Sequence, residues 1–190
     1  MGRPPRFSAE QMLDTARSLV ASGGAQTLTM TAVADRLGAP SGSVYHRFES
    51  RDHLAAELWL RTVERFQDEF IEQLDTGGDP IEVAVSAARG VVEWCVAHPD
   101  DAVVLTRFRR QELVSRDVPV AQARRAKALA RRLDKALARL ADRLNRPVDL
   151  VTLAVAGIPY SAVRPALGAG RPVPKWAAEG VERAVRALLC

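Results

Sequence analysis

Hydrophobic residues recur at intervals of three and four through most of the chain, a period that predicts α-helices from one end to the other. The first helix is expected to begin after Ser8, which forms a capping-box pattern with Gln11, and to stop at Gly23. The second is expected to begin at Thr29 and to end at Gly38. Glycine adopts the left-handed conformation that a tight turn between two helices often needs.

The third predicted helix is short, about two turns, and places Val44 and Phe48 one turn apart on its inner side. Its other residues then face outward: Ser41, Gly42, Ser43, His46 and Arg47, with Tyr45 at the margin. A helix of this length is not stable alone. We therefore expect the first two helices to hold it and its outer face to be free for contact with another molecule.

Six further helices are predicted beyond the third, which makes about nine in all. Five are marked by the spacing of their apolar residues, in the ranges 54–74, 81–97, 120–146, 148–167 and 174–189. The helix 81–97 is apolar on all sides but one and is expected at the centre of a bundle. Another is expected to be capped by Asp100 or Asp101, and Gly157 with Pro159 permits a kink in a later one.

The composition is that of an ordinary globular protein, with 190 residues of which 47% are hydrophobic and 26% charged. The net charge of +4 is compatible with a polyanionic partner but does not establish one. Cys95 and Cys190 have no metal-binding or redox spacing, so a reducing cytoplasm is the expected location. No signal peptide pattern follows Met1, and the apolar stretch Leu150–Ile158 is shorter than a bilayer span, so we expect a soluble protein.

The segment LTMTAVADRLGAPSGSVYHRFESRDHL, residues 28–54, resembles the helix-turn-helix signature of the tetracycline-repressor (TetR) family of bacterial transcriptional regulators. The matching features are Leu28-Thr29, Val33-Ala34, the turn glycine Gly38, the run Gly42–Tyr45, Phe48, Ser50-Arg51 and Leu54. The resemblance runs from about Phe7 to Leu58, about a quarter of the chain, and is much weaker beyond. It implies an all-α protein with a DNA-binding domain at residues 1–51 and a helical ligand-binding and dimerisation domain at residues 52–190.

The resemblance also implies a set of DNA-binding residues around the second and third helices: Thr29, Ser41, Gly42, Ser43, Tyr45, His46, Arg47 and Arg51. Arg51 stands where the family usually has a phosphate-binding lysine. Arg3 and Arg6, which precede the first helix, are expected to add electrostatic contacts in a minor groove.

Two departures from the family pattern change the expected mode of recognition. Pro40 stands where the family often has a serine or threonine cap, so the cap is expected to shift to Ser41. Ser41 in turn stands where the family often has a long base-reading side chain, which leaves few bidentate base contacts. Specificity is therefore expected to depend on Arg47, His46 and the shape of the DNA.

Each of these residues, taken singly, has a simpler interpretation. Tyr45 and Phe48 alone would more often be core aromatics, and His46, Arg47 and Arg51 alone would more often belong to a solvated face. Only the combined pattern favours DNA binding.

The predicted helix 120–146 is strongly cationic, with nine basic residues against Asp134 and Asp142. The basic residues are Arg124, Arg125, Lys127, Arg131, Arg132, Lys135, Arg139, Arg143 and Arg146. Such a run is usually a solvated face, but it could also bind an anionic ligand near a pocket or attract DNA at long range. An alternative function follows: a helical module that binds acidic surfaces or anionic ligands through this helix, without sequence-specific DNA binding.

The resemblance further implies a ligand cavity enclosed by the fourth to eighth helices. Aromatic residues in that region are candidates for its wall: Trp59, Phe66, Phe70, Trp94, Phe108 and Tyr160. Each of them, taken alone, is also explained as part of an ordinary core.

The resemblance places a dimer interface on the last two helices. Its expected surfaces are the apolar faces of Leu150–Val163 and Ala177–Leu189, the latter a narrow seam suited to another helix. The alternative is that these seams pack only within the subunit. A dimer is preferred because a palindromic DNA site needs a two-fold protein.

No pattern of catalytic residues is present, so an enzyme is not expected. His46, His53 and His98 are scattered, and His98 with Asp100 and Asp101 is better explained by the end of one helix and the cap of the next than by a metal. We expect no metal and no cofactor. The predicted protein is a cytoplasmic one-component regulator, most simply a repressor. The resemblance implies a homodimer that binds a palindromic operator in double-stranded DNA and is released by a small-molecule effector.

Overall fold

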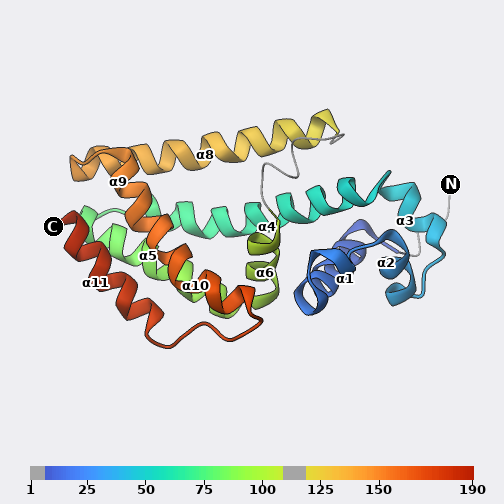
Figure 1. Cartoon of the computed structure of the whole chain (residues 1–190). Helices are drawn as coiled ribbons and strands as arrows, with labels where there is room; N and C mark the ends of the chain where they lie inside the picture. The colour runs from blue at the N-terminus through green and yellow to red at the C-terminus, as the bar shows by residue number, and fades with distance from the viewer. Residues whose placement is uncertain (1–6, 109–118) are drawn as a thin grey trace.

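The structure is a computed structural model that describes residues 7–108 and 119–190. Within these ranges the chain forms nine α-helices, counting the continuous run 148–168 as one, and no strand. The predicted all-α class is confirmed. Figure 1 shows three short helices, α1 to α3, at one end of the molecule and α5, α10 and α11 at the other, with the long helix α4 reaching from one group to the other.

The N-terminal helices begin and end close to the predicted positions. They are α1 (Ala9–Gly23), α2 (Met30–Leu37) and α3 (Ser41–Arg47), with a 3₁₀ turn η1 (Ala25–Thr27) between the first two. The capping box is present: the Ser8 hydroxyl accepts from the Gln11 backbone N–H, and the Gln11 side chain accepts from the Ser8 N–H. Gly38 has a φ of 63° and ends α2 in the left-handed conformation. These local signals therefore fix the start of α1 and the end of α2.

Helix α4 (Arg51–Leu74) joins two hydrophobic cores and lies beside α8 (Val120–Leu144) (Figure 1). Leu54 and Leu58 pack with α1, α2 and α3, whereas Phe70 and Leu74 belong to the core of the C-terminal helices. The pattern of apolar residues predicted this helix. Because α4 packs into both cores, it connects the N-terminal helices to the C-terminal helices.

The helices α5 (Pro80–Ala97) and α6 (Pro99–Arg107) follow each other with only His98 between them. The predicted cap for the second of these helices, Asp100 or Asp101, was wrong. His98 occupies the cap position and Pro99 the first helical position, where the missing N–H of proline costs nothing. Asp101 instead lies within the first turn of α6 and is buried.

The run 148–168 is one helix interrupted by a π turn: α9 (Val148–Thr152), η2 (Leu153–Gly157) and α10 (Ile158–Gly168). The π turn accommodates Pro159, which has no N–H to donate and whose ring would meet the carbonyl four residues earlier in a regular helix. The run has 21 residues and is long and apolar enough to cross a membrane, although the shorter stretch Leu150–Ile158 was expected to be too short. One such helix is weak evidence for a membrane protein, since core helices pass the same test.

The last helix, α11 (Ala177–Leu189), begins three residues later than expected and packs against α5. Its seam residues Ala177, Val181 and Val185 are buried within this chain. These three residues are therefore covered by α5, whereas Ala184 and Leu188 of the same seam are half-buried, and the expected dimer interface on this helix stays a prediction. Among residues 148–190 the large apolar side chains that remain exposed are Val148, Leu153, Tyr160 and Trp176.

Candidate DNA-binding surface and ligand cavity

Helix α3 is anchored by two side chains and exposes the rest. Val44 and Phe48 are buried in the N-terminal core, as predicted. Ser41, Gly42, Tyr45, His46 and Arg47 are exposed, and Ser43 is half-buried. The sequence therefore brings the predicted polar and small residues to one outward surface.

Two details of α3 differ from the expectation. Pro40 occupies the cap position and makes no side-chain hydrogen bond, and Ser41 is the first helical residue, so the predicted shift of the cap to Ser41 was wrong. Tyr45 is 53% exposed and so is not a core aromatic, whereas Phe48 is one. A tyrosine on this surface presents its hydroxyl to solvent, where it can donate to a phosphate oxygen.

Thr29 lies at the N-terminus of α2 and is exposed. Its hydroxyl accepts from the Ala32 N–H at 3.0 Å and lies 3.1 Å from the Thr31 hydroxyl. Thr31, which the sequence analysis did not select, thus adds a second exposed hydroxyl at a helix N-terminus. Hydroxyls and free N–H groups at such an end are suited to an anion.

Arg51 makes contacts within its own chain. Its guanidinium donates to the carbonyl oxygens of Leu28 at 3.1 Å and Ala25 at 2.9 Å, and to the Asp52 carboxylate at 3.1 Å. It therefore ties the first turn of α4 to the turn that leads into Thr29. The expected phosphate contact of Arg51 stays a prediction, and the geometry adds a positioning role. Arg3 and Arg6 lie outside the described residues.

Four arginines of α8 bind α4 or the residues that follow it. Arg125 binds the carboxylates of Glu57 and Glu64, and these partners raise the pKa of Arg125 above its ordinary value. Three more arginines bind groups of α4 or of the residues that follow it: Arg132 binds Asp68, Arg139 binds Asp75, and Arg143 binds three backbone carbonyls. Carboxylates of the chain thus neutralise three of the nine basic residues, whereas Arg143 keeps its charge and is only hydrogen-bonded.

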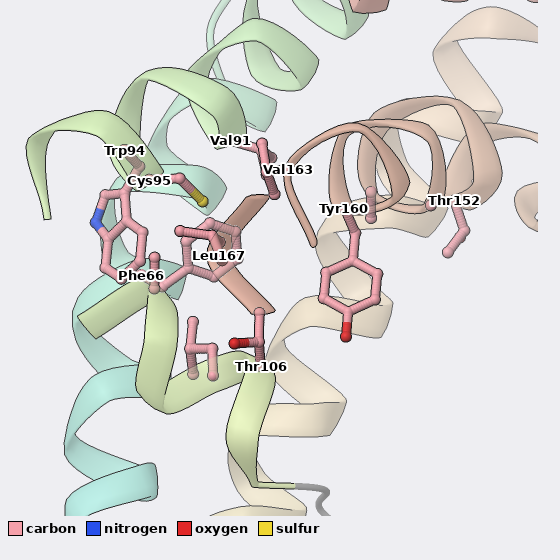
Figure 2. Close-up of a pocket in the computed structure, with 13 residues that line it drawn as sticks. Phe66, Val91, Trp94, Cys95, Thr106, Thr152, Tyr160, Val163 and Leu167 are labelled. Atoms are coloured by element: carbon pink, nitrogen blue, oxygen red, sulfur yellow. The ribbon is translucent and has the colours of Figure 1, made fainter. Parts of the chain in front are cut away.

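An apolar cavity of about 430 Å³ lies among α4, α5, α6 and the run 148–168 (Figure 2). Its wall includes three of the predicted aromatics, Phe66, Trp94 and Tyr160. The other three lie elsewhere: Phe70 stacks on Phe66 in the core, Phe108 is in the N-terminal core, and Trp59 packs between that core and α8. Which aromatics reach a cavity depends on how the helices pack, and the sequence pattern does not encode this.

The cavity wall carries few polar groups. Among the described lining residues they are the hydroxyls of Thr106, Thr152 and Tyr160 and the thiol of Cys95. Burial raises the pKa of the Cys95 thiol to about 11, so this group is uncharged at neutral pH. The cavity is therefore suited to an apolar molecule or to the apolar part of a larger one.

A hydrogen bond and a ring contact hold the Trp94 side chain in place. Its indole Nε1 donates to Glu69 at 3.2 Å, and its ring meets Phe66 edge to face, with centroids 5.1 Å apart. This fixes the orientation of one wall. Among the described residues no group of three or more His, Cys, Asp or Glu side chains could hold a metal ion.

Comparison with known proteins gives a consistent set of relatives. The sequence model of bacterial regulatory proteins of the tetR family matches residues 12–58. The HTH-type transcriptional repressor KstR2 of Mycolicibacterium smegmatis is 28% identical over 78 residues, 41% of this chain. That match spans only 38% of the length of KstR2.

Solved structures extend the similarity over the whole fold. A TetR-like transcriptional regulator from Rhodococcus sp. RHA1 is 25% identical, with a TM-score of 0.60 over 98% of this chain and 94% of that one. The transcriptional regulator FadR from Bacillus subtilis, solved in complex with stearoyl-CoA, is 14% identical, with a TM-score of 0.72 over 96% of this chain and 98% of that one. The C-terminal helices thus share the fold of these regulators as well.

Proposed function

We propose that this chain, which belongs to the TetR family of bacterial regulatory proteins, is a repressor that binds a palindromic operator as a homodimer and is released by a small molecule. The family assignment makes it a transcriptional regulator with a DNA-binding helix-turn-helix. The sign of regulation, the symmetry of the site and the response to an effector are the proposal.

The exposed surface of α3 supports the DNA-binding part of the proposal and is the observation that carries it. Val44 and Phe48 fix the helix, so its outward side chains are presented by a rigid element. Tyr45 and the Thr29 end of α2 are placed to contact phosphates, and His46 and Arg47 to reach a base edge or a flanking phosphate. With only small residues at the tip of α3, DNA shape supplies part of the specificity.

Exposed apolar side chains near the C-terminus support a dimer. Leu153 and Tyr160, seven residues apart on one helical run, are 51% and 43% exposed, and Trp176 is 60% exposed. Large apolar side chains left exposed to solvent are often part of a protein interface. A two-fold dimer would present two copies of α3 about 34 Å apart, one turn of DNA. The interface we propose consists of the run 148–168 and Trp176, with the outer side of α11.

The apolar cavity supports an effector. A ligand changes operator affinity only if it binds one spacing of the two α3 helices better than another. The wall of the cavity includes Leu105 and Thr106 of α6, and α6 also packs against α1 in the N-terminal group. A ligand that shifts α6 would therefore shift the DNA-binding end. The relative FadR was solved with stearoyl-CoA, which is consistent with an effector that has a long apolar part.

The test is the affinity of the full chain for the palindromic DNA fragment upstream of its gene, measured by fluorescence anisotropy. Arg47→Gln should weaken binding by roughly tenfold, and Tyr45→Phe by a few-fold through the lost hydroxyl. Arg131→Gln on the outer side of α8 is the matched control and should leave binding unchanged. If only Arg131→Gln weakens binding, the alternative of an acidic-surface module that acts through α8 replaces this proposal.

A further inference from the structure

A small cationic pocket adjoins the apolar cavity. It encloses about 330 Å³ and is lined by Thr106, Arg107, Arg164, Pro165 and Gly168. Thr106 lines both spaces, so the pocket begins where the cavity ends. None of these five lining residues, which all lie in the described part of the chain, is acidic.

Two helices, α6 and α10, contribute residues to both the cavity and the cationic pocket. On α6, Thr106 faces the cavity and the next residue, Arg107, faces the pocket. On α10, Val163 and Leu167 face the cavity, and the residues that follow them, Arg164 and Gly168, face the pocket. Figure 2 shows Thr106, Val163 and Leu167 around the cavity. An apolar wall thus passes directly into a cationic one.

The two arginines differ in how they are held. Arg107 donates through Nη2 to the Gly168 carbonyl at 3.0 Å, which fixes its guanidinium at the edge of the pocket and leaves further N–H groups for a ligand. Arg164 is exposed and makes no ion pair with any residue in the described ranges. Two guanidinium groups without a carboxylate between them attract an anion.

A third pocket also adjoins the cavity and differs in its charge. It shares Cys95 and Leu167 with the cavity, but its charged lining residues are one cation, Arg171, and one carboxylate, Asp100. Opposite charges there leave no preference for an anion. Of these two pockets, as lined by the described residues, only the one with Arg107 and Arg164 favours an anionic head group.

We infer that the cavity and the cationic pocket form one site for an amphipathic anion. The apolar body of the ligand fills the space around Phe66 and Trp94, and a carboxylate or phosphate lies between Arg107 and Arg164. This inference names the class of the effector and rests on the proposed function for its biological role. Neutral apolar molecules of the same size would fill the cavity but leave the two arginines without an anionic partner.

The experiment is isothermal titration calorimetry of the full chain with four matched ten-carbon probes: decanoate, decyl phosphate, 1-decanol and decyltrimethylammonium. At least one of the two anions should bind roughly fivefold or more tightly than 1-decanol, and the cation should bind most weakly. Exposed charge pairs contribute only modestly to binding, so the expected difference in affinity is about fivefold rather than larger. Decanoate and decyl phosphate distinguish a carboxylate ligand from a phosphate ligand. Equal affinities for the alcohol and both anions, or no binding of either anion, would overturn the inference.

Substitutions of single arginines test which side chain binds the anion. Arg164→Gln should lower the affinity for the tighter anion to that for 1-decanol and leave the alcohol unchanged, and Arg164→Lys should restore much of the loss. Arg171→Gln, beside the third pocket, is the matched control. A loss of anion binding in Arg171→Gln but not in Arg164→Gln would overturn the assignment. So would a fall in melting temperature of Arg164→Gln without a change in affinity, since the arginine would then serve only the helix end.

Calorimetry involves no DNA, so the two proposals fail separately. Anion binding without operator binding would remove the proposed regulator and keep the site. Operator binding that no anion affects, with no calorimetric preference for anions, would keep the regulator and remove the site.

Discussion

Asp101 of α6 accepts a hydrogen bond from Arg65 of α4 at 2.8 Å, and the Asp101 side chain is only 2% exposed. The same carboxylate oxygen also receives Arg17 of α1 at 3.5 Å. Three helices therefore meet at one buried charge. Leu105, one turn further along α6, lines the apolar cavity. The contact between α1 and α6 thus lies a single helical turn from the proposed ligand.

Replacing Asp101 with asparagine should destabilise the protein and weaken the connection between α1 and α6. Removing one partner of a buried ion pair is costly. Because Arg17 and Arg65 are partly exposed, we expect a loss of about 1–2 kcal/mol in the free energy of unfolding, less than for a fully buried pair. Urea denaturation measures it. Asp100→Asn, at the neighbouring position, is the control and should change stability little; equal losses in the two variants would contradict the prediction.

The ion pairs between α8 and α4 should be energetically coupled. A double-mutant cycle with Glu64→Gln and Arg125→Gln should give a coupling energy of about 1 kcal/mol, since both side chains are about one-third exposed. The coupling should decrease at high salt. The control cycle, Glu64→Gln with Arg131→Gln, should be additive. A coupling near zero for Glu64 and Arg125 would mean that α8 is held on α4 by its apolar seam alone.

Signals that act within one helical turn predicted the structure well. The Ser8 and Gln11 capping box and the Gly38 turn are settled by neighbouring residues, and they appear as expected. The cap of α6 was misplaced because two signals compete there, and Pro99 at the first helical position outweighs the aspartates that follow it.

Properties that depend on packing were predicted less well. The spacing of the apolar residues on α11 suits packing against a helix of the same subunit or of a second one. Only the fold shows that α5 packs against these residues. Arg107 and Arg164 are separated by 57 residues in the chain and carry no local motif. Their neighbourhood arises from the packing of α6 against α10, so no pattern in the sequence could have indicated the cationic pocket.

The two glycines on either side of Pro40 should respond differently to alanine. Gly38 has a φ of 63°, so Gly38→Ala should cost about 1 kcal/mol through backbone strain and also disturb the placement of α3. Gly42 is helical and an added Cβ meets no atom within 4 Å, so Gly42→Ala should keep or slightly raise stability. It should nevertheless lower operator affinity, because the new methyl lies on the proposed DNA-binding face. Thermal unfolding and DNA anisotropy measure both effects; an unchanged operator affinity in Gly42→Ala would place Gly42 outside the interface.

The two cysteines should be alkylated at very different rates. Alkylation needs the thiolate, and burial raises the pKa of Cys95 to about 11, so only about one Cys95 in a thousand is ionised at pH 8. Cys190 is exposed and should react with iodoacetamide first, as followed by mass spectrometry of the intact chain and its peptides. Similar labelling rates for the two cysteines at pH 8 would contradict the buried position of Cys95.

Raising the pH should change both the reactivity of Cys95 and the stability of the fold. The pKa of this thiol is higher in the folded chain than its ordinary value of 9.0, so the folded state keeps its proton where the unfolded state loses it. The resulting contribution to stability is complete below about pH 9 and is lost as the pH rises toward 11. Cys95→Ser, whose hydroxyl does not titrate in this range, should flatten this part of the alkaline decline measured by urea denaturation. A decline of the same steepness in Cys95→Ser would show that other groups cause it.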